Sequence, residues 1–250
     1  MDNQELVLIT GANGGVGFAL CSAFTASGFK VIATDSQTKP VLKLSASSYL
    51  ELDLAAFVND IDYAKQRLEQ LAQIIDGKGL FCLINNAAIQ ILKSTENLTR
   101  QDFGTSLQIN TMAPFFLSQA LLKDLEKAKG SILNISSIHA KLTKKNFVAY
   151  ATTKAALSGM TRALAVDIGN RVRVNAIEPA AVNTPMLKAS FLYNPQKLEE
   201  LKSIHPTGDI AAPNEIAAVA IMLTGRSVPF LNGAIIEVNG GVNCCLKDLD

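Results

Sequence analysis

The segment LVLITGANGGVG, residues 6–17, joins a short, mostly apolar run to a turn with four glycines. The run at 6–10 has the length and composition of a buried strand, and the residues after the turn predict a helix. Glycines here let the backbone approach a pyrophosphate closely, and free amides at a helix start favour its negative charge. The stretch TGANGGVG at 10–17 therefore predicts the phosphate-binding turn of a dinucleotide site, with a turn used only for tight packing as the alternative.

Short apolar runs alternate with amphipathic segments through most of the chain. Repeated strand-then-helix order predicts a parallel sheet with helices on both faces. We therefore expect one α/β domain over residues 1–250, a doubly wound, Rossmann-type, seven-stranded parallel sheet. The expected strands are 6–10, 30–35, 49–53, 80–85, 130–136, 172–178 and 234–240.

Three connections between these strands have distinctive sequences. Apolar residues step by three and four through 61–75, which predicts a helix. The segment 35–53 contains Pro40 and several serines, and it has little room for a full helix. Residues 183–213 contain four prolines and no clean strand pattern. We expect this segment to be a helical excursion that acts as a mobile lid.

Composition and charge limit the classes of partner. The chain is 48% hydrophobic with a net charge of +1 and no basic run, which favours a small molecule or another subunit over nucleic acid or a membrane surface. Acidic residues precede the first apolar run, the reverse of a signal peptide, so we expect a cytoplasmic protein. Four cysteines without zinc-like spacing predict reduced thiols and no metal site, with Cys21 and Cys82 in the core.

Asp35 stands at the end of the second expected strand, 18 residues after Gly17 (35 − 17). A carboxylate at this position can accept hydrogen bonds from both hydroxyls of an adenosine ribose, and it would repel a 2′-phosphate. This position predicts NAD as the cofactor in preference to NADP. Ser36 brings no charge for a phosphate, whereas Lys39 is a nearby cation that would favour NADP.

Tyr150 and Lys154 lie four positions apart in YATTKAAL, residues 150–157, a segment that reads as a helix. Side chains at this spacing share one helix face, so the phenol and the ammonium can point into one volume. An adjacent ammonium favours the phenolate and lowers the phenol pKa from its usual value near ~10. Taken alone, however, the pair is more typical of an ordinary helix surface than of a catalytic site.

Further motifs give this pair a context. They are LDL at 52–54, NNAA at 85–88, Asn110, ISS at 135–137, RVNAIEP at 173–179, Thr184 and NGG at 239–241. With TGANGGVG, Asp35 and YATTK, they cover nearly the whole chain, and in this set the sequence resembles the short-chain dehydrogenase/reductase family in its single-domain form. The separation of 13 residues between Ser137 and Tyr150 (150 − 137) also fits that family.

The resemblance implies a catalytic set of four residues. Tyr150 is expected to be the general acid/base, Ser137 a donor to the substrate oxygen, and Asn110 the anchor of a proton-relaying water. Lys154 is expected to hold the nicotinamide ribose and, together with an oxidised nicotinamide, to lower the phenol pKa. The residues expected at the cofactor are Gly11, Asn13, Gly15, Val16, Gly17, Asp35, Asp53, Leu54, Asn86, Ala87, Ala88, Tyr150, Lys154, Pro179, Val182 and Thr184.

Two positions depart from the family pattern, because alanine stands where the family has glycine. They are Ala88 in NNAA and Ala180 after Pro179, and an added methyl group limits positive φ near the nicotinamide end. The substrate pocket is predicted less directly, by position along the chain. Its candidate residues are Gln90, His139, Phe147, Phe191 and Tyr193, whereas His205 is interpreted as a loop residue.

These features favour an NAD-dependent oxidoreductase that acts on a secondary alcohol or ketone. Two alternatives are an NADPH-dependent 3-oxoacyl carrier-protein reductase, against which Asp35 argues, and a non-catalytic NAD-binding sensor or scaffold, against which the complete catalytic set argues. The helices expected around 100–127 and 150–168 carry more apolar residues than one core stripe needs, including the consecutive Phe115, Phe116 and Leu117. This surplus predicts a homo-oligomer, expected to be a tetramer.

Overall fold

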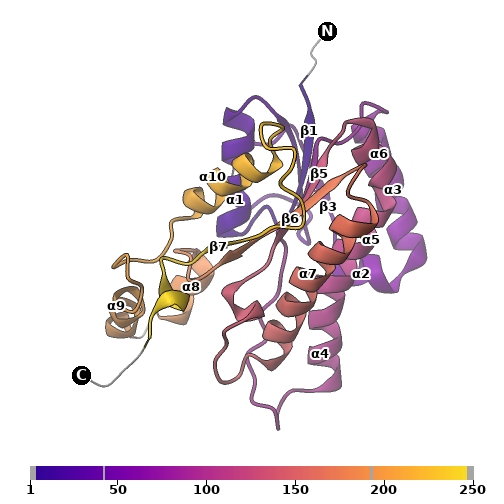
Figure 1. Cartoon of the computed structure of the whole chain (residues 1–250). Coiled ribbons are helices and arrows are strands. Elements are labelled where there is room, and N and C mark those ends of the chain that lie inside the picture. Colours follow the sequence, from indigo (N-terminus) through magenta and orange to yellow (C-terminus); the bar gives the residue numbers. More distant parts are fainter. Residues whose placement is uncertain (1–3, 42, 192–193, 247–250) are drawn as a thin grey trace.

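A computed structural model of the chain describes residues 4–41, 43–191 and 194–246. Seven parallel strands form one sheet in the order β3-β2-β1-β4-β5-β6-β7 (Figure 1). They are β1 (Leu6–Thr10), β2 (Lys30–Asp35), β3 (Ser48–Glu51), β4 (Cys82–Asn85), β5 (Ser131–Ile135), β6 (Arg173–Pro179) and β7 (Ile235–Val238). The predicted doubly wound sheet is confirmed, with strand ends that differ by one or two residues. The order reverses between β1 and β4, where such sheets bind their ligands at the carboxyl ends of the strands.

Helices cover both faces of the sheet (Figure 1). The helices are α1 (Gly15–Ala26), α2 (Leu54–Asn59), α3 (Ile61–Ile75), α4 (Arg100–Leu107), α5 (Ala113–Ala120), α6 (Leu122–Lys127), α7 (Val148–Asp167), α8 (Pro185–Ser190), α9 (Pro195–Ser203) and α10 (Pro213–Thr224). Shorter helical turns are η1 (Gln108–Met112), η2 (Ile138–Ala140) and η3 (Val242–Cys244). One core lies between the sheet and α1 with α10, and the other between the sheet and α2, α3, α5, α6 and α7. In the described residues no helix has the length and apolar character needed to cross a bilayer.

The predicted helix at 61–75 is confirmed as α3, and its start has a local cause. The carboxylate of Asp60 accepts hydrogen bonds from the amides of Asp62 and Tyr63, which caps the first turn. As expected, the described part of the connection between β2 and β3 contains no helix. Cys21 and Cys82 are fully buried, as predicted, and burial raises the pKa of both thiols to about 12.

The expected long helix around 100–127 is instead divided into α4, η1, α5 and α6. The first break is η1, a turn of π-helix that contains Asn110. Its position has a chemical reason, because Pro114 stands four residues after Asn110 and has no N–H to donate to the Asn110 carbonyl. Turns of this kind are frequent at functional sites.

The segment 183–213 contains two short helices, α8 and α9, set apart from the helices that cover the sheet (Figure 1). Proline is the first residue of α8, α9 and α10, where its missing N–H is tolerated and its fixed φ favours a helix start. A single bridge between Val182 and Ala211 ties the two ends of the segment together. The predicted helical excursion is therefore present, and its ends are close in space.

Candidate active site

The glycine-rich turn is built so closely that side chains do not fit at two positions. Gly11 has a φ of +67°, and a Cβ there would lie 2.7 Å from the Cα of Ala87. At Gly17, a Cβ would lie 2.0 Å from the Gly11 carbonyl oxygen. Both positions therefore require glycine for the fold of the turn itself. A Cβ at Gly15 would meet the side chain of Thr184 at 2.9 Å, so the root of the 183–213 excursion lies against the turn.

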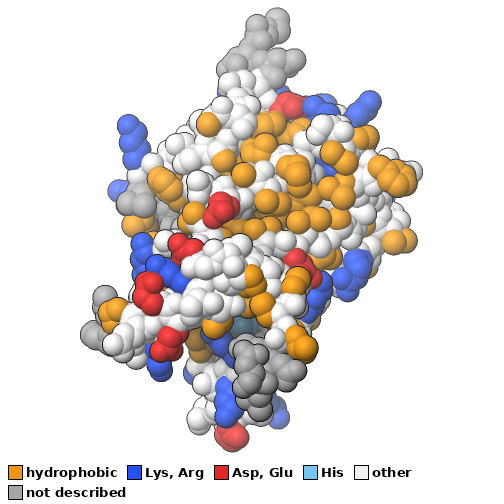
Figure 2. Space-filling view, turned by 60° about the vertical axis from the view of Figure 1, so that its left-hand side comes forward, with side chains coloured by type: hydrophobic (Ala, Val, Ile, Leu, Met, Phe, Trp, Pro, Cys, Tyr) orange, Lys and Arg blue, Asp and Glu red, His pale blue; other side chains and the backbone are white. Residues whose placement is uncertain are grey.

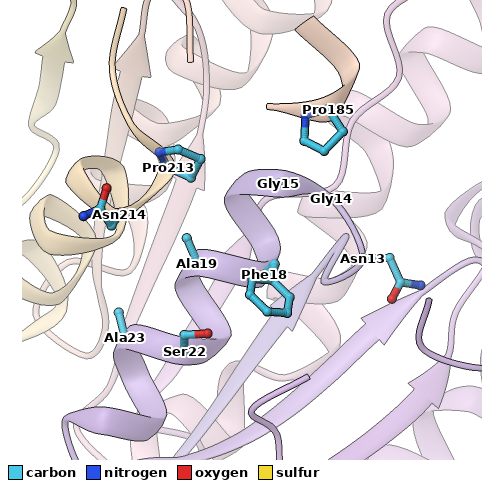
Figure 3. Close-up of a pocket in the computed structure, with 10 residues that line it drawn as sticks. All are labelled: Asn13, Gly14, Gly15, Phe18, Ala19, Ser22, Ala23, Pro185, Pro213 and Asn214. Carbon is cyan, nitrogen blue, oxygen red and sulfur yellow. The ribbon is translucent and has the colours of Figure 1, made fainter. Parts of the chain in front are cut away.

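The start of α1 is open to a ligand. Its N-cap, Gly14, has no side chain, so no side-chain oxygen caps the first amides of the helix. A cavity of about 640 Å³ lies beside this helix start (Figure 3). It is lined by Asn13, Gly14, Gly15, Phe18, Ala19, Ser22, Ala23, Pro185, Pro213 and Asn214. The close glycine turn and the uncapped helix end fit the pyrophosphate of a dinucleotide.

Asp35 is half-buried at the end of β2, where it contacts the glycine-rich turn. Its Oδ2 accepts a hydrogen bond of 2.9 Å from the backbone N–H of Asn13. The Asn13 side chain in turn donates to the hydroxyl of Tyr49 at 3.2 Å. Sequence analysis missed Tyr49, which the pairing of β2 with β3 places opposite Ala33, two residues before Asp35. Ser36 and Lys39 are both exposed beside this end of the site.

Two other predicted cofactor motifs have clear structural roles. In NNAA, the amide of Asn86 donates to the carbonyls of Thr10 and Gly11, and the backbone N–H groups of Asn86 and Ala87 both donate to the Thr10 hydroxyl. This motif therefore braces the glycine-rich turn. In LDL, the carboxylate of Asp53 caps α2, while the side chain of Leu54 is buried in the core. Val16 lies in the first turn of α1 and packs against the core.

Lys154 is 2% exposed, although it carries an ammonium group. Its Nζ donates a hydrogen bond of 2.7 Å to the carbonyl of Ile135 and lies 5.7 Å from the centre of the Tyr150 ring. Burial lowers the pKa of Lys154 to about 7. The structure thus confirms the predicted proximity of the phenol and the amine.

Burial raises the pKa of Tyr150, and the hydrogen bond with the Ser137 side chain lowers it in part. Sequence analysis predicted a lowered pKa from the Lys154 ammonium together with an oxidised nicotinamide, whereas in the protein without cofactor the pKa is raised. Burial of the phenol away from water raises its pKa by more than the hydrogen bond with Ser137 lowers it. Ser137 is buried at the start of η2, where its hydroxyl also accepts a hydrogen bond from the His139 amide.

Asn110 is buried in η1 and links both ends of the site. Its side chain exchanges two hydrogen bonds with the backbone of Ile89, which follows NNAA, and donates to the Thr153 hydroxyl at 3.0 Å. Thr153 itself donates to the carbonyl of Tyr150 at 2.8 Å. The side-chain amide of Asn110 therefore holds the framework, and Pro114 leaves the Asn110 backbone carbonyl without its α-helical donor.

Two of the predicted pocket residues pack beside Tyr150. The rings of His139 and Phe147 stack with centres 4.3 Å apart, and both meet the Tyr150 ring edge-on. Burial, with a smaller effect from Lys144, lowers the pKa of His139 to about 4. Gln90 is exposed, Phe191 is half-buried after α8, and Tyr193 lies outside the described residues.

The remaining candidates lie at or after the end of β6. Pro179 is the last residue of β6, and Val182 and Thr184 follow it at the root of the excursion. Neither Ala88 nor Ala180 has a positive φ, so the methyl groups cause no backbone strain there. His205 is in a loop, as expected, but it is buried, and its Nδ1 lies 2.8 Å from the Leu201 carbonyl.

Several known proteins resemble this chain over nearly its whole length. A protein family described as enoyl-(acyl carrier protein) reductase matches residues 11–243. D-threitol dehydrogenase from Mycolicibacterium smegmatis is 32% identical over 243 residues, which cover 95% of this chain and 92% of that protein. The ligand-free structure of aldohexose dehydrogenase from Thermoplasma acidophilum has a TM-score of 0.90 at 27% identity, covering 99% of this chain and 97% of that one.

Two further structures contain a nicotinamide cofactor. One is 4-hydroxyisoleucine dehydrogenase complexed with NADH, with a TM-score of 0.85 at 25% identity and coverage of 97% of this chain and all of that one. The other, from Beutenbergia cavernae, is described as an NAD(P)-dependent gluconate 5-dehydrogenase with bound NADP, with a TM-score of 0.85 at 26% identity and coverage of 98% of this chain and all of that one. Fold, site and relatives together define a nicotinamide-dependent oxidoreductase with a small-molecule substrate. The chain belongs to the short-chain dehydrogenase/reductase family.

Proposed function

We propose that the protein is an NAD-dependent oxidoreductase that transfers a hydride between the nicotinamide and a secondary alcohol or ketone. The observation that carries this proposal is the convergence of Ser137, Tyr150 and Lys154 at one place, joined by Asn110 to the phosphate-binding turn. A catalytically idle binding protein has no need to keep this set. The relatives named above point to small polar molecules that carry hydroxyl groups as the first substrates to test.

In this proposal, side chains of the protein transfer the hydroxyl proton of the substrate and hold substrate and cofactor in position. A bound nicotinamide would supply the hydride acceptor for oxidation of the alcohol and the hydride donor for the reverse reaction. Tyr150 takes the hydroxyl proton of the alcohol as the C–H bond is broken, and Ser137 donates a hydrogen bond to the same substrate oxygen. Lys154 holds the ribose and adds positive charge beside the phenol. The backbone carbonyl of Asn110 anchors the water that relays the proton to solvent.

The preference for NAD over NADP is proposed from Asp35. This carboxylate lies beside the glycine-rich turn, where an adenosine ribose is expected, and it accepts the Asn13 amide there. A 2′-phosphate at this position would meet a like charge. Lys39, which is exposed beside this end of the site, is the cation that could compensate for it.

The test is turnover by the purified protein with a panel of polyols, aldoses, hydroxy acids and their ketones, each with NAD(H) and NADP(H), followed by the absorbance of the reduced nicotinamide. Turnover with NAD and a secondary alcohol supports the proposal. Turnover confined to NADPH and a 3-oxoacyl carrier-protein substrate would establish the reductase alternative. Cofactor binding without turnover of any compound would favour a sensor or scaffold.

We also propose that the chain is one cytoplasmic domain that forms a homo-oligomer, a tetramer by resemblance to its family. Met112, Phe115 and Phe116 each expose more than a third of their area along η1 and α5, whereas Leu117 is in the core. Further apolar side chains gather on the side of the molecule that carries α1 and α10 (Figure 2), and Met222 of α10 is exposed. Such faces are typical of subunit contacts. A monomer by light scattering at micromolar concentration would refute the oligomer.

The segment 183–213 is proposed to act as a lid. Thr184 at its root contacts Gly15 of the phosphate-binding turn, so movement of the segment would open or close the cofactor channel. Closure would exclude water during hydride transfer. Hydrogen exchange in this segment is expected to slow when cofactor and substrate saturate the protein, and unchanged exchange would refute a lid.

A further inference from the structure

A buried glutamate lies behind the proposed catalytic residues and has no part in the chemistry described above. Glu178 is the last residue but one of β6, and it is 1% exposed. The hydroxyl of Ser158, on α7, donates a hydrogen bond of 2.7 Å to its Oε1. A buried carboxylate is costly unless it is paired and hydrogen-bonded, so this position requires a structural or functional reason.

The hydrogen bonds of Glu178 continue toward the catalytic residues. Because Ser158 donates its proton to Glu178, Ser136 is the donor in the 2.8 Å contact between the two hydroxyls. Its proton is shared with the backbone carbonyl of Lys154, 3.0 Å from the Ser136 Oγ. Ser136 stands between Ile135, whose carbonyl holds the Lys154 ammonium, and Ser137, whose hydroxyl bonds Tyr150. The two serines therefore join the segment 135–137 to the middle of α7.

The other oxygen of Glu178 faces a cation. The Lys141 ammonium lies 3.5 Å from Oε2 and also bonds Glu237 on the neighbouring strand β7. These groups border a cavity of about 180 Å³ just after η2. Because Oε2 has no hydrogen-bond donor within the described residues, Lys141 is its electrostatic partner. Lys141 follows η2 directly, so this ion pair holds the far end of the turn that Ser137 begins.

We propose that Glu178 is a positioning residue that acts through Ser158 and Ser136 to fix Ser137 and the Ile135 carbonyl against Tyr150 and Lys154. It touches no reacting atom. Its effect is to hold the Ile135 carbonyl, at the end of β5, and the Ser137 hydroxyl, at the N-cap of η2, at a fixed distance from Tyr150 and Lys154 on α7. The ion pair with Lys141 orients the carboxylate. The inference rests on the proposed function, because it assigns Glu178 to the same site.

The pKa of the Tyr150 phenol distinguishes a positioning role of Glu178 from an effect on overall protein stability. The Ser137 hydrogen bond lowers the pKa of that phenol, so displacement of Ser137 would raise it. Among the described residues, the other charged or titratable groups on this side of the site are Lys154 on α7, His139 on η2 and Lys144, which lies over the Phe147 ring. None of these is changed in the variants below.

The test compares Ser158→Ala with Thr161→Val, which serves as a matched control on the same helix. Thr161 is also buried on α7 and also bonds a polar residue of β5, Asn134, at 2.9 Å, but this bond does not continue to Ser137. Ser158→Ala is expected to lower kcat by about tenfold, the equivalent of one lost hydrogen bond, with little change in the KM for substrate. The acidic limb of its pH profile for alcohol oxidation is expected to move to higher pH.

Glu178→Gln is the conservative variant, because its side-chain amide can still form a hydrogen bond with Ser158. Its kcat is expected to stay within about threefold of the wild-type value. Glu178→Leu cannot form this bond, and its kcat is expected to fall as in Ser158→Ala. A pH profile that is unchanged in Ser158→Ala, or moved equally in Thr161→Val, would overturn the proposal. Titration of the tyrosinate absorbance, with Tyr150→Phe as the reference, gives the phenol pKa without any turnover. If wild type turns over no substrate, the proposed function fails, and this titration still decides whether Glu178 positions Ser137.

Discussion

The cofactor end and the catalytic end of the site are built from different parts of the chain. At the cofactor end, Gly11 and Gly17 act by having no side chain, and the amides at the start of α1 are left uncapped. At the catalytic end, Asn110, Ser137 and Lys154 are buried side chains whose polar groups are held by other parts of the chain. One end therefore depends on backbone and open space, and the other depends on buried polar groups that must be paired.

This difference predicts different responses to mutation. A change at the cofactor end acts through steric fit or charge on a ligand that comes from solvent. A change at the catalytic end acts on proton transfer, or leaves a buried group without its partner. Binding and turnover should therefore be separable by single substitutions, and the size of each effect should follow from what the removed or added atoms touch.

The largest effect is expected at Tyr150. Tyr150→Phe keeps the ring packed against His139 and Phe147 but removes the transferable proton. Turnover should fall by ~10²-fold or more, while the Kd for NAD stays nearly unchanged. Lys154→Ala should lose both, because this residue supports the phenol and holds the ribose. Steady-state kinetics and cofactor titration by fluorescence measure the two properties, and a Tyr150→Phe enzyme with more than about a tenth of the wild-type rate would refute the assigned role.

A glycine substitution tests the cofactor end in the same way. In Gly17→Ala the new methyl group would lie 2.0 Å from the Gly11 carbonyl, so the turn must move. Overpacking of this kind costs about 1–3 kcal/mol, and we expect NAD to bind about ten- to a hundredfold more weakly. Gly104→Ala is the control, because a Cβ there meets nothing within 4 Å, and in the α4 helix it should stabilise the fold by about 0.5–1 kcal/mol. Equal NAD affinity in both variants would contradict the steric argument.

Substitution of Asp35 tests the effect of charge on cofactor preference at the cofactor end. At an effective dielectric of ~20, unit charges ~4 Å apart repel by about 4 kcal/mol, and solvent reduces this value. Half of it is still more than tenfold in affinity. Asp35→Ser with Ser36→Arg removes the carboxylate and adds a guanidinium suited to phosphate, so kcat/KM for NADP should rise relative to NAD. A wild-type preference for NADPH would refute the NAD assignment, and an unchanged ratio in the double variant would assign the choice to another residue, with Lys39 first.

The same difference explains how much of the molecule could be predicted from sequence. The strands and the glycine turn were predictable because their signals are local, as in residues 6–17. Tyr150, Lys154 and Ser137 were recognised by family spacing. Glu178 and Tyr49 were missed, since a glutamate or tyrosine in a strand shows its role only when the neighbouring strand and helix are in place. The raised pKa of Tyr150 was missed for a related reason, because sequence shows a nearby ammonium but not the extent of burial.

The smallest expected effect concerns His139, which is at the catalytic end but is held by stacking on Phe147. Its pKa is lowered from 6.5 to about 4, mainly by burial, so between these values the unfolded state binds more protons than the folded state. Stability should therefore fall as pH drops from 6.5 toward 4, by at most about 2 kcal/mol at pH 5 and by less because the imidazole is partly exposed. His139→Phe keeps an aromatic ring on Phe147 and removes the titration, so urea midpoints of this variant should depend less on pH than those of wild type. The Thr143 hydroxyl, 3.3 Å from Nδ1 in the wild type, lies in an exposed turn where water can replace the lost contact. Equal slopes of stability against pH for the two proteins would show that the fold does not lower the pKa of His139.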